Sequence, residues 1–290
     1  MASVISEDIK QTVAFIFHQR QELEPIGTGF FMGIAQENTH FIYFVTAKHV
    51  IMDETQVFLR LNLRNYDPSS NQLGTLYQPV QVKDDQGNLL WFVHSDPSVD
   101  VAVLPFAPNP ELIQFKCIGP EVLATRDIIA KEKVAEGDEI FFTGLLPQFY
   151  RTKRNYPVVR YGRIALLTDE VIEVQGEGPQ ELYFAECQTF PGNSGSPVFL
   201  RFGPTREPGV IRVGGERLFL LGLMKGYFSQ RQLLEIQETQ RLFLQFNENI
   251  GIAAIVPGEK IKDILYSVNL TRIREETTSR LKQKQSSVQL

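Results

Sequence analysis

This sequence of 290 residues contains little cysteine. The sequence also has no long apolar run of the kind found in membrane proteins. Only Cys117 and Cys187 are present, so there is no disulfide framework, and neither has the spacing of a zinc site. Buried free thiols are the simplest interpretation, with one bridge between them left open. No apolar run reaches the roughly 18 residues that span a bilayer, and the N-terminus lacks a secretory-signal pattern. We therefore expect a cytoplasmic protein without a membrane partner.

Clustered positive charge is also largely missing. The formal net charge is −5, and basic residues gather only at 151–154 and in the C-terminal tail. Solvated segments explain both clusters better than nucleic-acid binding does. Hydrophobic residues make up 43% and charged residues 22% of the chain, which suits a globular protein that buries a core without metals or disulfides. We expect no cofactor, no metal and no nucleic-acid partner.

Short runs rich in β-branched and aromatic residues dominate the chain, and turn residues separate them. This pattern predicts an all-β protein, a sandwich or barrel rather than βαβ units. The predicted strands cover residues 12–17, 28–35, 41–46, 56–63, 80–83, 89–93 and 99–104 in the first half, and 139–143, 158–167, 171–174, 182–187, 197–200, 218–227 and 251–256 in the second.

Helical patterns are confined to the end of the chain. Residues 229–248 begin with a Ser-x-x-Gln capping box and predict a helical insertion. A second helix is predicted from about 257 to 265, and the polar tail 267–290 is expected to be disordered or a frayed helix. The polar stretch 107–133 connects two halves, which we place at 10–118 and 119–266.

The sharpest chemical signal is the sequence PGNSGSP at 191–197, which contains Ser194. A serine hydroxyl is a weak nucleophile, so it needs a base and a site for the oxyanion that it creates. Glycines beside the serine let the backbone turn tightly and direct N–H groups at one point. The alternative interpretation is a Gly/Ser-rich hairpin turn.

A base of the required kind follows the strand 41–46. His49 lies just past the end of this strand, from where one ring nitrogen could reach the serine while an acceptor holds the other. The remaining histidines, His18, His40 and His94, are interpreted as structural or exposed.

An acidic residue opens the apolar run 99–104. A carboxylate such as Asp100 is out of place there unless its charge is needed. As an orienting group it would fix the tautomer of His49 and stabilise the imidazolium. The competing carboxylate is Asp96, which precedes Pro97 and is typical of a turn.

The order of TAKHV at 46–50, DVAVL at 100–104 and PGNSGSP at 191–197 is similar to that of the chymotrypsin-like serine peptidases. It most resembles the bacterial HtrA-like (Deg) branch and the glutamyl endopeptidases. The resemblance extends over about 12–265, with weaker matches at 28–31, 135–144, 221–224 and 249–257. It implies an all-β fold of two perpendicular six-stranded antiparallel barrels, with a C-terminal helix and no following PDZ domain.

The same resemblance implies the roles of the site residues. Ser194 would be the nucleophile, His49 the general base and then acid, and Asp100 the orienting carboxylate. The backbone N–H groups of Gly192 and Ser194 would form the oxyanion hole. Since the first half supplies His49 and Asp100 and the second half supplies Ser194, neither half would be active alone.

Three positions depart from the family pattern. Asn193 replaces the aspartate that zymogens pair with a newly freed N-terminus, so activation by N-terminal cleavage is not expected. Ser196 stands where many relatives have glycine, a change that the glutamyl endopeptidases share. Lys225 falls where a small hydroxyl residue often touches the catalytic aspartate, and we expect it to pair with Asp100 or to turn to solvent.

The resemblance also indicates a substrate-binding set, made of Gln188, Thr189, Lys225, Gly226 and Tyr227. Gln188 replaces the acidic residue that gives trypsin-like enzymes their basic preference, and Met224 replaces a histidine of the glutamyl endopeptidases. We predict cleavage after a medium-sized, uncharged residue.

The sequence thus predicts a serine endopeptidase that cleaves polypeptides through an acyl-enzyme. One alternative is a catalytically weak or inactive protein-binding module of the same fold, against which the complete triad argues. Another is an esterase, but the strand-to-helix elbow of the α/β-hydrolases does not fit an all-β pattern. Residues 229–248 or the C-terminal tail are the segments through which we expect a protein partner to bind.

Overall fold

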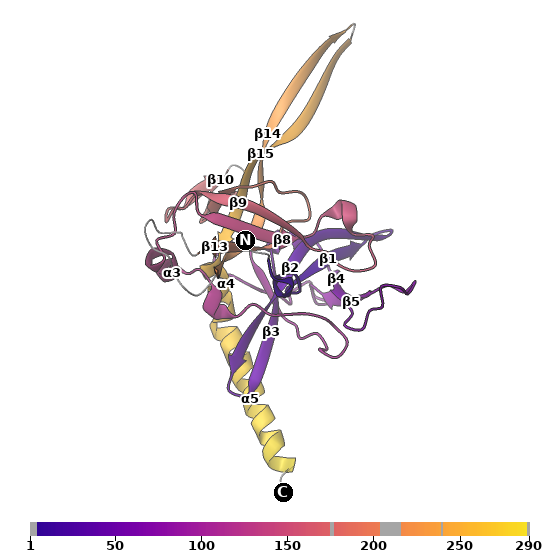
Figure 1. Cartoon of the computed structure of the whole chain (residues 1–290), viewed down its shortest axis with the longest axis vertical. Helices are drawn as coiled ribbons and strands as arrows, with labels where there is room; N and C mark the ends of the chain where they lie inside the picture. The colour runs from indigo at the N-terminus through magenta and orange to yellow at the C-terminus, as the bar shows by residue number, and fades with distance from the viewer. Residues whose placement is uncertain (1–4, 175–176, 204–215, 239, 289–290) are drawn as a thin grey trace.

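A computed structural model describes residues 5–174, 177–203, 216–238 and 240–288, and it describes no side chains for 228–249 and 284–288. β-Strands predominate in the described part, as the short apolar runs predict (Figure 1). A seven-stranded sheet forms the first half, and a closed six-stranded barrel forms the second. No described helix is both long and apolar enough to cross a membrane.

The first half is one antiparallel sheet with the strand order β5-β4-β1-β2-β3-β7-β6. The resemblance implies a six-stranded barrel here, whereas the hydrogen bonds join seven strands with β5 and β6 at the edges. Pro79 suits an edge strand because it has no N–H to donate to a second neighbour. The elements are α1 (Glu7–Lys10), β1 (Val13–Gln19), β2 (Leu23–Gln36), β3 (Thr39–Thr46), α2 (Lys48–Ile51), β4 (Gln56–Asn62), β5 (Thr75–Gln81), β6 (Phe92–Val93) and β7 (Ala102–Pro105).

The second half closes into a barrel with the strand order β12-β15-β14-β13-β8-β9, which confirms the barrel predicted for it. A separate two-stranded sheet, β10-β11, lies beside it. The elements are η1 (Pro120–Val122), α3 (Arg126–Lys131), β8 (Glu139–Gly144), η2 (Pro147–Phe149), β9 (Val158–Leu166), β10 (Ile172–Val174), β11 (Gly178–Gln180), β12 (Tyr183–Glu186), β13 (Pro197–Phe202), β14 (Arg217–Glu238), β15 (Gln240–Pro257), α4 (Gly258–Leu265) and α5 (Val268–Val288).

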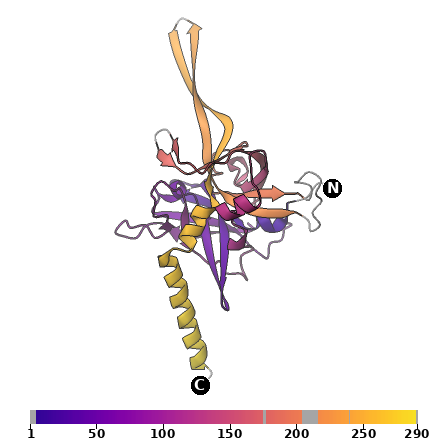
Figure 2. The same ribbon diagram turned by 90° about the vertical axis from the view of Figure 1, so that its left-hand side faces the viewer.

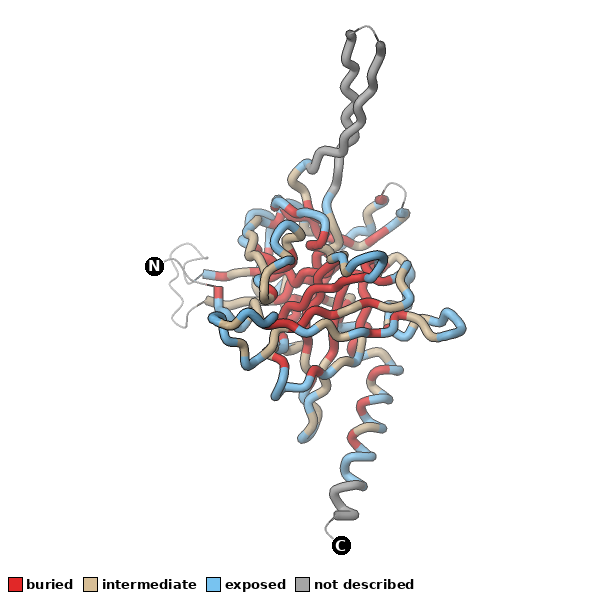
Figure 3. Tube along the Cα trace, turned by 90° about the vertical axis from the view of Figure 1, so that its right-hand side faces the viewer, coloured by how far each residue is buried: buried red, intermediate tan, exposed pale blue. Residues whose placement is uncertain are grey.

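Buried residues run through both halves (Figure 3), and they form two apolar clusters. One apolar cluster contains residues of the first sheet together with Phe141, Phe199 and Leu220 of the barrel. A second cluster fills the barrel itself. The chain crosses between the halves where Ile118 bridges to the first sheet and Leu123 bridges to Leu220.

The helix predicted for 229–248 is wrong. The described residues there continue strands β14 and β15 as a hairpin arm that projects from the body (Figures 1 and 2). Leu234 pairs with Leu244 and Ile236 pairs with Leu242 across it. These apolar residues recur at every second position, which is the period of a strand, and the capping box at Ser229 obscured this alternation.

The polar tail forms a long helix rather than a disordered segment. Its first half is held by buried Leu270, Arg274 and Thr278, which recur every four residues and therefore share one face. Arg274 Nη1 donates hydrogen bonds to the Tyr43 hydroxyl at 3.0 Å and to the Leu265 carbonyl at 2.7 Å. Because this buried face includes Arg and Thr, the hydrophobic pattern of the sequence did not reveal it.

The helix predicted near 257–265 is confirmed as α4, with Ile261, Ile264 and Leu265 buried. The two cysteines are free thiols. Cys187 is buried as expected, but Cys117 is exposed, which corrects the expectation that both are buried.

Candidate active site

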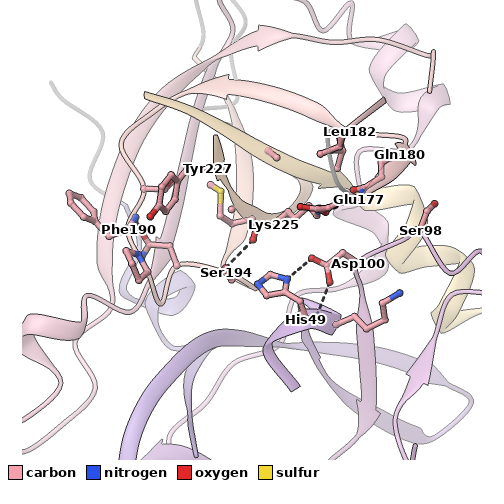
Figure 4. A pocket seen from close by; sticks show the side chains of 18 of the residues that line it. His49, Ser98, Asp100, Glu177, Gln180, Leu182, Phe190, Ser194, Lys225 and Tyr227 are labelled. Atoms are coloured by element: carbon pink, nitrogen blue, oxygen red, sulfur yellow. Dashed lines mark hydrogen bonds and ion pairs between the residues drawn. The ribbon is translucent and has the colours of Figure 1, made fainter. Parts of the chain in front are cut away.

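One cavity of about 860 Å³ is lined by residues of both halves. His49 and Asp100 reach it from the first sheet, and Ser194 reaches it from the barrel (Figure 4). The structure therefore brings together the three residues that the sequence singled out. The other histidines lie elsewhere: His18 pairs with Glu54, and His94 lies near Asp263.

His49 is the second residue of the short helix α2, which follows strand β3 after Ala47, and its side chain is half exposed. Its Nδ1 lies 2.6 Å from Asp100 Oδ2, and its backbone N–H donates to Asp100 Oδ1 at 2.8 Å. An ionised carboxylate only accepts hydrogen bonds, so Nδ1 carries the proton and Nε2 is left as an acceptor. In Figure 4 the imidazole lies between Ser194 and Asp100.

The Asp100 side chain is 7% exposed, and this burial acts to raise its pKa. The hydrogen bonds and charge of His49, with the charge of Lys225, outweigh burial, so the pKa lies below its ordinary value of 3.8. A carboxylate with a lowered folded-state pKa stabilises the fold above its unfolded pKa. That contribution is lost as the pH falls through the folded-state pKa. Because this pKa lies below 3.8, Asp100 is ionised at neutral pH.

Ser194 lies in the tight turn that precedes strand β13. The turn needs glycine at two places, because Gly192 has φ +91° and Gly195 has φ +84°. A Cβ at Gly195 would also lie 2.0 Å from the Thr28 carbonyl oxygen. The backbone N–H groups of Gly192 and Ser194 donate to no acceptor among the described residues.

The Ser194 hydroxyl donates to the Lys225 carbonyl at 2.9 Å rather than to His49 Nε2. Catalytic hydrogen bonds are often long or misaligned in a substrate-free enzyme and shorten when substrate binds.

Thr28 holds this turn from across the boundary between the halves, a role that the sequence did not signal. The fully buried Thr28 hydroxyl donates to the Gly192 carbonyl at 2.8 Å and accepts from the Leu145 N–H at 3.0 Å. Its backbone N–H donates to the Ser194 carbonyl at 2.9 Å. These partners are more than a hundred residues away along the chain, beyond the reach of a local pattern.

Thr28→Val keeps the shape of the side chain but removes the hydroxyl. We expect the Gly192 carbonyl and the Leu145 N–H to lose a buried partner, at about 1–3 kcal/mol for each group left unsatisfied. Urea unfolding should show this loss, and the rate of labelling by a fluorophosphonate should fall with it. Thr39→Val is the matched control, because the Thr39 hydroxyl makes no hydrogen bond within the described residues. Equal stability of both variants would contradict the role of Thr28.

Asn193 fastens the turn from inside the barrel. It is 3% exposed, its amide N–H donates to the Leu145 carbonyl, and its Oδ1 accepts from the Phe190 N–H at 2.8 Å. The Asn193 amide therefore links the turn to two backbone groups of the second half.

Asn193→Asp is expected to destabilise the protein by about 3–5 kcal/mol at neutral pH, because it buries an unpaired charge against a carbonyl oxygen. The defect should shrink as the pH falls, since a protonated carboxyl can donate to Leu145 as the amide does. Thermal unfolding between about pH 4 and pH 8 would test this, because a buried carboxyl with a raised pKa titrates in roughly that range. Asn109→Asp is the control, because the exposed Asn109 side chain acts only as an acceptor, through Oδ1 from the Glu111 N–H. A defect independent of pH would contradict the explanation.

Four of the five residues expected to bind substrate line the cavity, and they are Thr189, Lys225, Gly226 and Tyr227. Gln188, the fifth residue of the expected set, is exposed and is not among the residues that line this cavity. Neighbouring residues of an extended chain point to opposite sides, so Thr189 faces inward and Gln188 faces out.

Lys225 neither pairs directly with Asp100 nor turns to solvent, which were the two expected positions of its side chain. Its ammonium pairs with Glu177, in the turn between β10 and β11. Burial acts to raise the pKa of Glu177, but hydrogen bonds from Lys225 and Gln180 outweigh it and lower the pKa. Glu177 and Gln180 were absent from the sequence prediction because no motif marks that hairpin.

The mostly-β fold thus brings His49, Asp100 and Ser194 to one cavity. The family model described as "Trypsin-like peptidase domain" matches residues 27–203, more than half of the chain. The chain therefore belongs to the trypsin-like peptidase family.

Comparison with known proteins also returned solved protease structures. The inactive form of Rv3671c from M. tuberculosis H37Rv has 16% identity and a TM-score of 0.44, covering 90% of this chain and 89% of that one. Deg5 has 16% identity and a TM-score of 0.47, covering 90% and 92%. The HtrA-type protease AlgW with decapeptide has 15% identity and a TM-score of 0.45, covering 90% and 66%. No curated protein matches in sequence.

Proposed function

We propose that this chain is a serine endopeptidase with His49, Asp100 and Ser194 as its catalytic triad. The observation that carries the proposal is the two-point hold of Asp100 on His49, at 2.6 and 2.8 Å, beside Ser194 in one cavity. The family, whose model describes a peptidase, supports the reaction class. The intact triad supports an active enzyme over a binding module.

The reaction follows from the positions of these groups. His49 Nε2 takes the proton of the Ser194 hydroxyl as its oxygen attacks the peptide carbonyl. The oxyanion accepts hydrogen bonds from the N–H groups of Gly192 and Ser194, whose donors have no other described acceptor. His49 then donates the proton to the leaving amine, which leaves an acyl-enzyme. Water activated by the same imidazole hydrolyses this ester.

The primary pocket beside Ser194 supports cleavage after a medium-sized, uncharged residue. Its lining includes Thr189, Met224 and Ala254, with Phe190 and Tyr227 near the mouth (Figure 4). Neither carboxylate nor ammonium occurs among these side chains. A charged residue would lose its hydration there without gaining a partner.

Two assays of the purified chain test the proposal. A fluorophosphonate probe should label Ser194, and the chain should digest casein mainly after uncharged residues. Absence of labelling would instead favour the inactive binding module. Labelling without casein digestion, but with hydrolysis of small esters, would favour an esterase.

We also propose, separately from the peptidase activity, that a protein partner binds to this chain. The arm formed by β14 and β15 and the helix α5 both project from the body (Figures 1 and 2). Projecting segments of this kind give a peptidase surfaces for a protein partner away from its cleft.

A further inference from the structure

The cavity extends well beyond the primary pocket, and its far side is mainly polar. On the other side of His49 from Phe190 and Tyr227, the polar residues Glu177, Gln180 and Ser98 line the wall together with the apolar residue Leu182 (Figure 4). Glu177 and Gln180 belong to the β10-β11 hairpin, and Ser98 belongs to the loop before Asp100. This second compartment has no role in the triad chemistry described above.

Two acceptors in this compartment are unfilled. Glu177 Oε2 accepts from Gln180 Nε2 at 3.0 Å and from the Lys225 ammonium, but Oε1 accepts from no described residue. The Glu177 side chain is 54% exposed. Gln180 is 5% exposed, and its Oε1 is a buried acceptor that also has no partner in the described part of the chain. A buried acceptor without a donor costs free energy that a donor-bearing group could recover.

The charged groups around the compartment are already engaged. The Lys225 ammonium is paired with Glu177 and its side chain is only 12% exposed. The Lys48 ammonium donates to the Pro97 carbonyl at 2.5 Å, next to Ser98. Asp100 is taken up by His49. Glu177 is paired with Lys225 through Oε2, but its side chain is widely exposed and its Oε1 keeps free hydrogen-bonding capacity.

The position of the compartment relative to Ser194 indicates which substrate residue would reach it. A substrate that pairs with β14 in an extended conformation points successive side chains to opposite sides. If the residue before the scissile bond enters the primary pocket, the residue one position earlier points away from it. That side chain passes over His49 toward Glu177 and Gln180.

We propose that Glu177 and Gln180 form a subsite that selects a lysine or arginine immediately before the residue of the primary pocket. This proposal rests on the proposed endopeptidase function. An ammonium or guanidinium supplies several N–H donors and a positive charge, which match the unfilled acceptors and the carboxylate. The preferred substrates are thus polypeptides in which a basic residue is followed by an uncharged one at the cleavage site.

The test uses the full chain and a set of quenched peptides. All peptides carry, before the scissile bond, the residue found most often there in the casein digest. They differ only one position earlier, where they carry Lys, Arg, Gln or Glu. We expect kcat/KM for the Lys and Arg peptides to exceed that for the Glu peptide by about tenfold at low salt, and by less at high salt because the carboxylate is half exposed.

Glu177→Gln should reduce the Lys-to-Glu ratio to about one to two, because the charge is removed while an amide of similar size remains. Glu173→Gln is the matched control. Glu173 is exposed on the same hairpin but does not line the cavity, so this variant should keep the wild-type ratio.

The outcomes separate this subsite from the endopeptidase proposal itself. Hydrolysis of all peptides with equal kcat/KM, or a ratio that Glu177→Gln leaves unchanged, would overturn the subsite alone. A preference for the Glu peptide would also overturn it and would point to Lys48. If no peptide were cleaved and no fluorophosphonate were bound, both proposals would fail.

Discussion

Ser194→Ala is expected to remove nearly all peptide hydrolysis and to leave the fold intact. Without the hydroxyl there is no nucleophile to form an acyl-enzyme, and losing one member of such a triad lowers turnover by about 10⁴ to 10⁶. The described hydrogen bonding of the Ser194 side chain is a single bond to the Lys225 carbonyl. Its removal should therefore change the free energy of unfolding by about 1 kcal/mol.

The measurement is kcat/KM on a quenched peptide, with circular dichroism and thermal unfolding as evidence of folding. Ser196→Ala is the matched control, since Ser196 lies two residues later in the same turn. The buried Ser196 hydroxyl makes no described hydrogen bond, so its loss should leave activity within about twofold, as expected for groups outside the chemistry. More than a few per cent of activity in Ser194→Ala would exclude Ser194 as the nucleophile.

Asp100→Asn should lower kcat by about 10⁴ while the geometry of the site persists. The asparagine amide can donate to His49 Nδ1, which would place the imidazole proton on Nε2, where it cannot take the serine proton. Asn also carries no charge to stabilise the imidazolium. Activity should recover partly at alkaline pH, where hydroxide substitutes for the missing base.

Asp96→Asn is the control for this substitution. Asp96 is four residues away and exposed, and its carboxylate accepts hydrogen bonds from the backbone and side chain of Ser98. Its variant should keep kcat within about twofold, as surface substitutions usually do. If the two variants lost activity equally, Asp100 would not be the residue that orients His49.

Two of the three triad candidates could be predicted because their local sequence marks them. Ser194 lies between glycines that the turn requires, and Asp100 is a carboxylate at the start of an apolar run. The barrel strands likewise follow from short runs of apolar residues. His49 required more, since its neighbours form only a strand end, and the order of the three motifs supplied the rest.

The missed residues act over long sequence distances. Thr28 binds Gly192 and Leu145 from another part of the chain, and its own sequence context is that of an ordinary strand residue. Glu177 is a charged turn residue until the fold brings it to Lys225. The arm was mistaken for a helix because a local capping signal at Ser229 competed with the strand alternation.

The arm and the cleft share the same two strands, and this has a consequence for the evolution and engineering of the protein. Gly226 pairs with Ala254 at the cleft, and Ser229 pairs with Asn249 at the base of the arm, with one register irregularity between them, at Tyr227/Ser229. Residues deleted or inserted in equal numbers on both strands beyond these pairs leave the register at the cleft unchanged. The arm is thus a module of adjustable length. It could be shortened or replaced by a foreign hairpin while β14 and β15 keep their register at the cleft.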